Sequence, residues 1–289
     1  MRKFCLVDDS VSGIGGTMLT LSALTEDYLD DIDFISTYDF SLRDVFRKDR
    51  FFIFGNITHF SKNSLDAIIH CMENFAFIKI EFDYGYCSSR GRIPHQILQN
   101  EKCNCPNNHL RDLYSLIASK ATHIFYMSEA QKSIHSLDLD LEDSSRQSVL
   151  SSCFSKENLL TFKKLKDKKK NDNYAIIDGN GGWHTQAKGI KQSIEYAEAN
   201  NLKYDLIKTK THSEMLEKLS SYKGLISMPI IEDTCPRITL EARYMGLEVL
   251  TNENSQHISE DWWKSSDKEA FSFTASRPNY FWEEMKCLS

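Results

Sequence analysis

The chain has 289 residues, a length that suits two domains, and 41% of its residues are hydrophobic, enough for a sizeable core. Its net charge of −6 argues against a protein that coats nucleic acid but does not exclude a local basic cleft. The sequence has no apolar run near the roughly 20 residues of a membrane span and no signal segment at its N-terminus, so we expect a cytoplasmic protein.

The first half of the sequence alternates short apolar runs with amphipathic segments. We expect strands at residues 3–7, 33–36, 50–54, 77–82, 122–127 and 148–150, and helices at 18–24, 64–75, 110–120 and 129–136. Repeated strand–helix units predict a parallel sheet with helices on both faces, and such sheets bind ligands beyond the carboxyl ends of their strands. We therefore expect five polar residues near one rim, either as functional groups or as caps and surface residues: Asp8, His59, Glu81, Asp83 and Ser128.

A glycine-rich loop follows the first expected strand. Gly13 and Gly15 fit the dinucleotide-binding pattern G-x-G-x-x-G, but Met18 stands at its last glycine position. We favour a tight turn at Gly15 and Gly16 that lets the backbone approach a phosphate or an acceptor. The alternative is a turn with a purely steric role.

The segment from Cys87 to His109 is long for a loop, and loops of this length are usually functional or disordered. Eight cysteines without a secretion signal suggest a reducing compartment, with the thiols free or bound to a metal. Cys87, Cys103, Cys105 and His109, with His95 spare, are the residue types of a tetrahedral zinc site. Free thiols or a redox pair are the alternatives.

One basic feature lies within this segment and another follows it. Arg90 and Arg92 suit recognition of a phosphate or carboxylate, or they belong to a solvated basic loop. The lysine-rich run at 163–170 is interpreted as a solvated linker, because it lies between two folded segments, and a nucleic-acid patch is the alternative.

The second half repeats the alternation of strands and helices. We expect strands at 174–177, 204–207, 225–228 and 247–251, helices that end at 199 and span 213–222, and an aromatic terminal helix built from 262–263 and 278–285. The loop at 178–189 has three glycines near its start, Gly179, Gly181 and Gly182, and has Lys188 near the following helix, so it can cradle a phosphate. Because the G-K-[ST] of a P-loop is absent, nucleoside triphosphate hydrolysis is not supported.

The most informative stretch is the strand–loop–helix–strand unit at 224–251. Thr234 or Cys235 can cap its helix, Pro236 suits the first helical position, and a glycine ends it. A helix N-terminus at the carboxyl edge of a parallel sheet attracts an anion, typically a phosphate. Asp233 and Glu241 flank this point, eight positions apart, and Glu241 can accept hydrogen bonds from sugar hydroxyls.

These residues resemble the GT-B glycosyltransferases of retaining family 4, in which an acidic residue and, eight positions later, a glutamate lie on the segment that holds the sugar nucleotide. Asp233 and Glu241 match those two positions. Further stretches resemble a small phage- or virus-type subgroup: 233–242, 247–250, 256–257, Tyr86-Cys87 with Arg90, Cys103 and Cys105, Lys188-Gly189 and Phe281-Trp282. The resemblance implies an α/β fold with two Rossmann-like parallel-sheet domains facing a cleft. The implied division is an acceptor-side domain at 1–160, a linker at 161–172, a donor-binding domain at 173–275 and a terminal helix at 276–289 that returns to the first domain.

The resemblance also implies roles for individual residues. Glu241 would bind the donor ribose, Asp233 would lie near the transferred sugar, and Lys188 would hold the diphosphate. The remaining donor-binding set is Gly15, Gly16, Gly182, Thr234, Pro236 and Arg237. On the acceptor side, Glu81 and Asp83 are the candidate catalytic residues with Asp233, but Phe82 stands where relatives carry a histidine. Trp183 likewise replaces an arginine of the relatives, and Arg237 or Lys210 is the expected substitute.

The implied reaction moves a sugar from a nucleoside-diphosphate sugar, such as a UDP-sugar, to a hydroxyl acceptor with retention of configuration. No metal or other cofactor is expected for catalysis. The expected acceptor is a glycan or surface polymer, and the alternative is a hydroxymethylated base in phage DNA. A non-catalytic protein that binds a small ligand is the alternative of another class.

Overall fold

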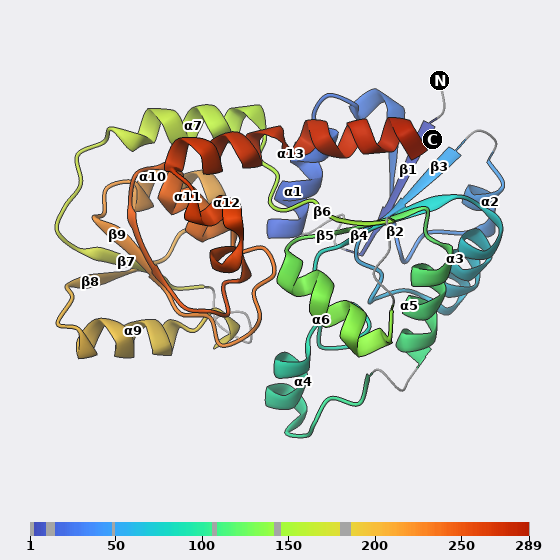
Figure 1. The fold of residues 1–289 in the computed structure, drawn as a ribbon, viewed down its shortest axis with the longest axis horizontal. Helices are drawn as coiled ribbons and strands as arrows, with labels where there is room; N and C mark the ends of the chain where they lie inside the picture. Colours follow the sequence, from blue (N-terminus) through green and yellow to red (C-terminus); the bar gives the residue numbers. More distant parts are fainter. Residues whose placement is uncertain are drawn as a thin grey trace. The chain divides into compact units, whose positions relative to one another are not determined.

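The computed structural model describes residues 3–9, 15–47, 50–105, 109–141, 146–179 and 186–288, apart from the His109 side chain. The chain divides into two compact units: unit 1 contains Met1–Ser155 and Ser276–Ser289, and unit 2 contains Lys156–Ala275. Each unit has its own parallel sheet (Figure 1). In the described part of the chain, no helix is long and apolar enough to span a membrane.

Unit 1 is built on a sheet whose six described strands run parallel in the order β2-β1-β3-β4-β5-β6. They are β1 (Lys3–Asp8), β2 (Ile32–Ser36), β3 (Arg50–Phe54), β4 (Phe77–Glu81), β5 (His123–Tyr126) and β6 (Gln147–Val149). Every residue of β4 is buried, as expected for a central strand with both faces covered. The six strands expected in this half all form, each within one residue at either end.

Helices cover both faces of this sheet. The described helices among the first 155 residues are α1 (Gly16–Thr25), η1 (Leu29–Asp31), α2 (Leu42–Val45), α3 (Lys62–Asn74), α4 (Arg92–Gln99), α5 (His109–Lys120) and α6 (Glu129–Leu139), of which α4 lies away from the sheet (Figure 1). On one face, Phe52 and Phe77 share a core with Ile68 of α3 and Leu113 of α5. Ser128 caps α6 as expected, since its side chain accepts a hydrogen bond from the backbone amide of Gln131.

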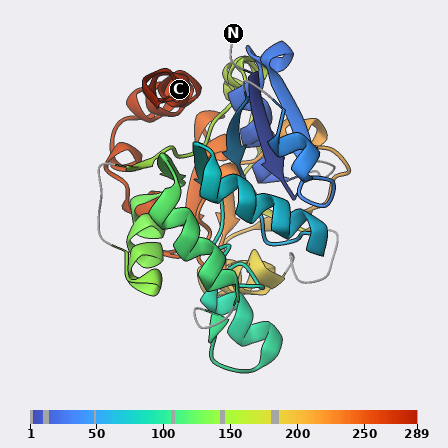
Figure 2. The same cartoon turned by 90° about the vertical axis from the view of Figure 1, so that its right-hand side faces the viewer.

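The C-terminal helix covers the opposite face. The rings of Phe4 and Trp282 lie 5.0 Å apart, and Trp282 Nε1 donates a hydrogen bond to the Leu24 carbonyl at 2.6 Å. Figure 2 shows this end of α13 (Asp267–Leu288) nearly end-on, apart from the teal and green helices of the first face. The prediction that 262–263 and 278–285 form one terminal helix is wrong, because Trp262 and Trp263 lie in a separate short helix, α12 (Asp261–Lys264).

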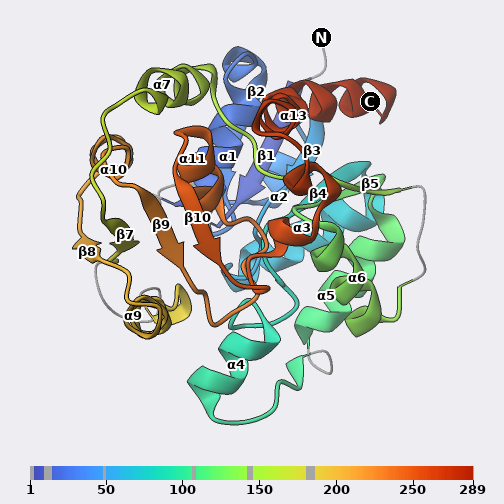
Figure 3. The ribbon, with the colours of Figure 1, turned by 60° about the vertical axis from the view of Figure 1, so that its left-hand side comes forward.

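Unit 2 is built on a smaller sheet, with its described strands parallel in the order β10-β9-β7-β8. They are β7 (Tyr174–Ile177), β8 (Tyr204–Ile207), β9 (Gly224–Ser227) and β10 (Glu248–Thr251). The remaining helices are α7 (Lys156–Lys166), α9 (Ile190–Ala199), α10 (His212–Leu219), α11 (Arg237–Tyr244) and η3 (Gln256–Ser259). Figure 3 shows α9 on one side of this sheet and α10 and α11 on the other. Ile176 and Ile226 of the sheet pack with Ala197 of α9.

Two segments interpreted from the sequence as irregular contain helices. The first part of the expected linker belongs to α7, where Phe162 and Leu165 are buried and the Phe162 ring lies 6.1 Å from that of Tyr244 in α11. The apolar residues of α7 anchor it to unit 2, so its lysines lie on the outer side of a packed helix. The segment after Cys87 likewise contains α4 and is not one long loop.

Candidate functional site

The candidate site lies at the carboxyl ends of the strands of unit 2. From β7 the chain passes to β8 on one side and then to β9 on the other. In open α/β sheets, ligands bind in the crevice beyond such a switch point, because the loops from the two strands diverge there. The described residues that follow β7 and β9 should therefore include the binding groups.

The helix that follows β9 begins one residue later than expected. Pro236 occupies the N-cap position of α11, with φ −72° and ψ 71°, and Arg237 is the first helical residue. Thr234 is buried in the preceding loop, and Pro236 at the N-cap position makes no capping hydrogen bond of its own. At the other end, Gly246 takes φ +72°, and the amides of Gly246 and Leu247 bond to the carbonyls of Arg243 and Ala242. This Schellman arrangement confirms that a glycine ends the helix.

Glu241 is buried on α11 and lies beside a histidine that the sequence did not single out. Its Oε1 lies 2.9 Å from Nε2 of His212, the first residue of α10, and 3.7 Å from Nε of Arg237. Arg237 is itself 5% exposed, so its guanidinium is directed to Glu241 and not to solvent. This contact could not be predicted from the sequence, because a single histidine at the start of a helix forms no recognisable pattern. The contact depends on how α10 and α11 pack.

Lys188 and Asp233 meet at the same edge of the sheet. Lys188 Nζ lies 2.6 Å from Asp233 Oδ2, with the lysine side chain half exposed and the aspartate largely buried. The Asp233 backbone is held on both sides, because its amide donates to the Asn254 carbonyl and its carbonyl accepts from the Gln256 amide. The loops after β9 and β10 thus position this carboxylate.

Gly189, beside Lys188, brings the chain into contact with the end of β9. It takes φ +66°, and a Cβ atom there would lie 1.6 Å from the Met228 carbonyl oxygen. The Ile230 amide also donates to the Ala187 carbonyl at 3.1 Å. Only glycine allows this approach, which places Lys188 next to the loop that carries Asp233.

Gly189→Ala should therefore lower the free energy of unfolding by at least about 2 kcal/mol, through backbone strain and the clash with Met228. Gly15→Ala is the matched control, since Gly15 is extended at φ −173° and no described atom lies within 4 Å of an added Cβ. The control should cost less than about 1 kcal/mol. Denaturant unfolding of both variants measures the difference, and equal midpoints would contradict the close packing at Gly189.

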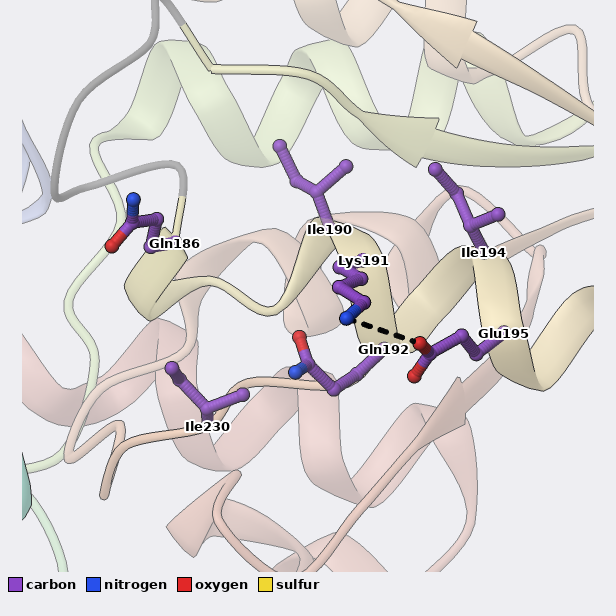
Figure 4. A pocket seen from close by; sticks show the side chains of 7 residues that line it. All are labelled: Gln186, Ile190, Lys191, Gln192, Ile194, Glu195 and Ile230. Atoms are coloured by element: carbon purple, nitrogen blue, oxygen red, sulfur yellow. Dashed lines mark ion pairs between the residues drawn. The ribbon is translucent and has the colours of Figure 1, made fainter. Parts of the chain in front are cut away.

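A groove of about 690 Å³ runs along α9 (Figure 4). Its described lining includes Ile190, Ile194 and Ile230, and Lys191 pairs with Glu195 at its rim. Lys188, Asp233 and Glu241 are not among these described lining residues. The groove is mainly apolar, so we do not assign it the binding of a charged donor.

In unit 1, the structure describes Gly15 and Gly16 but not the preceding residues 10–14. Gly15 is extended and Gly16 begins α1. Neither glycine adopts a positive φ, and the rest of the expected turn lies outside the described residues, so the turn stays a prediction. Gly182 and Trp183 also lie outside the described residues.

Asp83 lies in a charged group at the carboxyl edge of the sheet of unit 1. Arg90 Nη2 donates to both oxygens of Asp9 at 2.9 Å, and Arg90 Nη1 lies 3.3 Å from Asp83 Oδ2. The same Asp9 accepts from the amides of Thr58 and His59 at 3.2 Å. Asp83 is about one third exposed, so it remains accessible to a ligand.

Glu81, by contrast, is enclosed in the core, and its expected place at an open rim is wrong. Its Oε2 lies 2.8 Å from Lys79 Nζ, with both side chains at most 1% exposed, and its Oε1 accepts from the Gly85 amide at 2.9 Å. Burial raises the pKa of Glu81, and Lys79 opposes that rise. Burial also lowers the pKa of His135, 3.9 Å away, to about 3, so His135 is neutral at pH 7 and does not form an ion pair with Glu81.

A candidate metal-binding group lies in the segment that follows β4. Its described members are Cys87, His95, Cys103 and Cys105, with one ligand atom from each lying within 4.8 Å of all the others. His95 thus occupies the place expected for His109, whose side chain is outside the described part of the chain. All four residue types are ligands of zinc.

No protein-family model and no curated protein matches the sequence significantly. Among solved structures, the chain is similar to Alr3699/HepE of Anabaena in complex with UDP and glucose, with a TM-score of 0.52 and 11% identity over 86% of this chain and 80% of that one. A second structure of the same protein, in complex with UDP, gives a TM-score of 0.50 and 13% identity over 98% of this chain and 90% of that one. This likeness concerns the fold. Together with the two parallel sheets, it confirms the predicted fold class, an α/β chain with two Rossmann-like domains of the GT-B type.

Proposed function

We propose that the chain is a glycosyltransferase that uses a nucleoside-diphosphate sugar as donor. The observation that carries the proposal is the pair of acids on the loop and helix after β9. Asp233 lies 2.6 Å from Lys188, and Glu241 lies 2.9 Å from His212, all at the carboxyl edge of one sheet. This set combines a cation for a diphosphate with carboxylates for sugar hydroxyls.

Each group has a definite task in this reaction. As the bond to the sugar breaks, negative charge builds on the leaving diphosphate, and Lys188 can stabilise it by turning from Asp233 to the phosphate oxygens. Asp233 then faces the transferred sugar. Glu241 accepts hydrogen bonds from the ribose hydroxyls, and His212 holds its carboxylate in place. In this proposal Arg237 orients Glu241 and does not bind the diphosphate.

The finer assignments rest on the sequence resemblance and the structural neighbour. The UDP and glucose bound to Alr3699/HepE support a UDP-sugar as donor. We assign the acceptor to the class of hydroxyl groups on a glycan or surface polymer, with retention as in family 4. Asp83, partly exposed beside Arg90, is the proposed catalytic residue of unit 1, whereas Glu81 is buried beside Lys79 and has no such role.

A screen of nucleotide sugars tests the proposal. Thermal shift and donor hydrolysis are measured with UDP-, GDP-, ADP- and dTDP-sugars, with the free nucleoside diphosphates and free sugars as controls. We expect one nucleotide class to raise the melting temperature and to be hydrolysed slowly without acceptor, because a ligand that binds only the folded state stabilises it. Neither stabilisation nor turnover with any nucleotide sugar would contradict the proposal.

A further inference from the structure

The segment from Cys87 to Cys105 brings four soft ligands to one point within unit 1. Cys87 follows β4 in a turn, where its amide donates to the Tyr84 carbonyl at 3.0 Å. His95 lies in the first turn of α4, and its amide donates to the Gly91 carbonyl at 3.0 Å. Cys103 and Cys105 follow that helix. Three of the four side chains are buried, with Cys103 intermediate.

Three of the distances between the ligand atoms are close to those of a tetrahedral zinc site, and all of them are within 4.8 Å. With Zn–S of about 2.3 Å and Zn–N of about 2.05 Å, tetrahedral angles place two sulfurs about 3.8 Å apart and a sulfur and a nitrogen about 3.6 Å apart. Cys87 Sγ lies 3.7 Å from Cys103 Sγ. His95 Nδ1 lies 3.7 Å from Cys87 Sγ and 3.3 Å from Cys105 Sγ.

A carboxylate lies near the second nitrogen of the histidine. His95 Nε2 is 3.7 Å from Glu101 Oε1, which is longer than a hydrogen bond. A carboxylate that accepts a hydrogen bond from the far nitrogen keeps the proton there and leaves Nδ1 as the electron-pair donor, as in many zinc sites. Glu101 belongs to the same segment and would need to approach by less than about 1 Å to take this role.

We propose that Cys87, His95, Cys103 and Cys105 bind one zinc ion in a closed structural site. Four protein ligands complete the tetrahedron and leave no position for water, so the ion has no part in catalysis. Its effect is to hold the segment in shape. Between the first two ligands lies Arg90, which adopts φ +58° and binds both Asp9 and Asp83. Zinc thus positions a guanidinium at the carboxyl edge of the first sheet.

Metal content of the purified protein tests this inference independently of any transferase activity. We expect about one zinc per chain without added metal, measured by elemental analysis. Cys105→Ser and His95→Ala should lose most of it, whereas His95→Cys should retain zinc because four-thiolate sites are common. The control variants His109→Ala and Cys287→Ser, the latter at an exposed cysteine, should also retain it.

The wild-type protein provides a second readout in case a variant fails to fold. Titration with a mercurial thiol reagent should release zinc to a chromogenic chelator as about three thiols react, as expected for three cysteine ligands. Wild-type protein that lacks zinc and does not take it up after reduction would overturn the proposal. Loss of zinc in His109→Ala but not in His95→Ala would overturn the ligand set.

Discussion

Glu241→Ala is expected to lower kcat/KM for the donor by about 30- to 1,000-fold, which corresponds to about 2–4 kcal/mol of lost charge-assisted hydrogen bonds to the ribose hydroxyls. The carboxylate is 2% exposed and held by His212 and Arg237, so solvent is poorly placed to replace it. Glu241→Gln should have a smaller effect, because one oxygen remains an acceptor. Steady-state donor hydrolysis with the nucleotide sugar found in the screen gives the comparison.

The matched control is Glu195→Ala, which removes an acid of the same unit from the exposed rim of the α9 groove. It should leave turnover unchanged. Because Glu241→Ala also removes a partner of two basic side chains, His212 and the buried Arg237, the melting temperature of each variant is measured first, and activity is compared well below it. Wild-type turnover by a folded Glu241→Ala protein would place the donor elsewhere.

The buried pair of Lys79 and Glu81 is the second site where a large effect is expected. Glu81→Leu should lower the free energy of unfolding by about 3–5 kcal/mol, because it leaves the Lys79 ammonium in the core without its counter-charge. Lys79 is fully buried, and besides Glu81 it contacts the Ile80 carbonyl at 2.6 Å. Denaturant unfolding at pH 7 measures the change.

The double variant Lys79→Met/Glu81→Leu separates the effect of the unpaired charge on stability from the effect of altered packing. Replacement of both partners by apolar residues of similar volume is often neutral or stabilising, so it should recover most of the loss. Glu217→Leu is the surface control, since its pair with Lys168 at 2.7 Å is largely exposed and should leave the midpoint nearly unchanged. A double variant as unstable as Glu81→Leu would show that poor side-chain packing, and not the unpaired Lys79 charge, causes the loss of stability.

Local patterns predicted most of the regular structure. The strands are short apolar runs, and burial on both faces of a parallel sheet gives such runs a clear signal. The glycine that ends α11 was predictable for a similar reason, since Gly246 adopts a backbone conformation that other residues rarely take. The helix in the lysine-rich segment was not predicted, because Phe162 and Leu165, the two residues that anchor it, give only a weak apolar pattern among many charged residues.

By itself, the sequence determined the α/β class, the two sheets and the position of Asp233 and Glu241 on one strand–loop–helix unit, because these follow from periodicity and from spacing along the chain. Only the tertiary structure decided which distant side chains meet. In the structure, Glu241 contacts His212, His95 lies with the three cysteines of the candidate metal site, and Glu81 is enclosed beside Lys79. Such contacts depend on how helices pack against a sheet and on which residues that packing removes from water, and neither is encoded in local spacing.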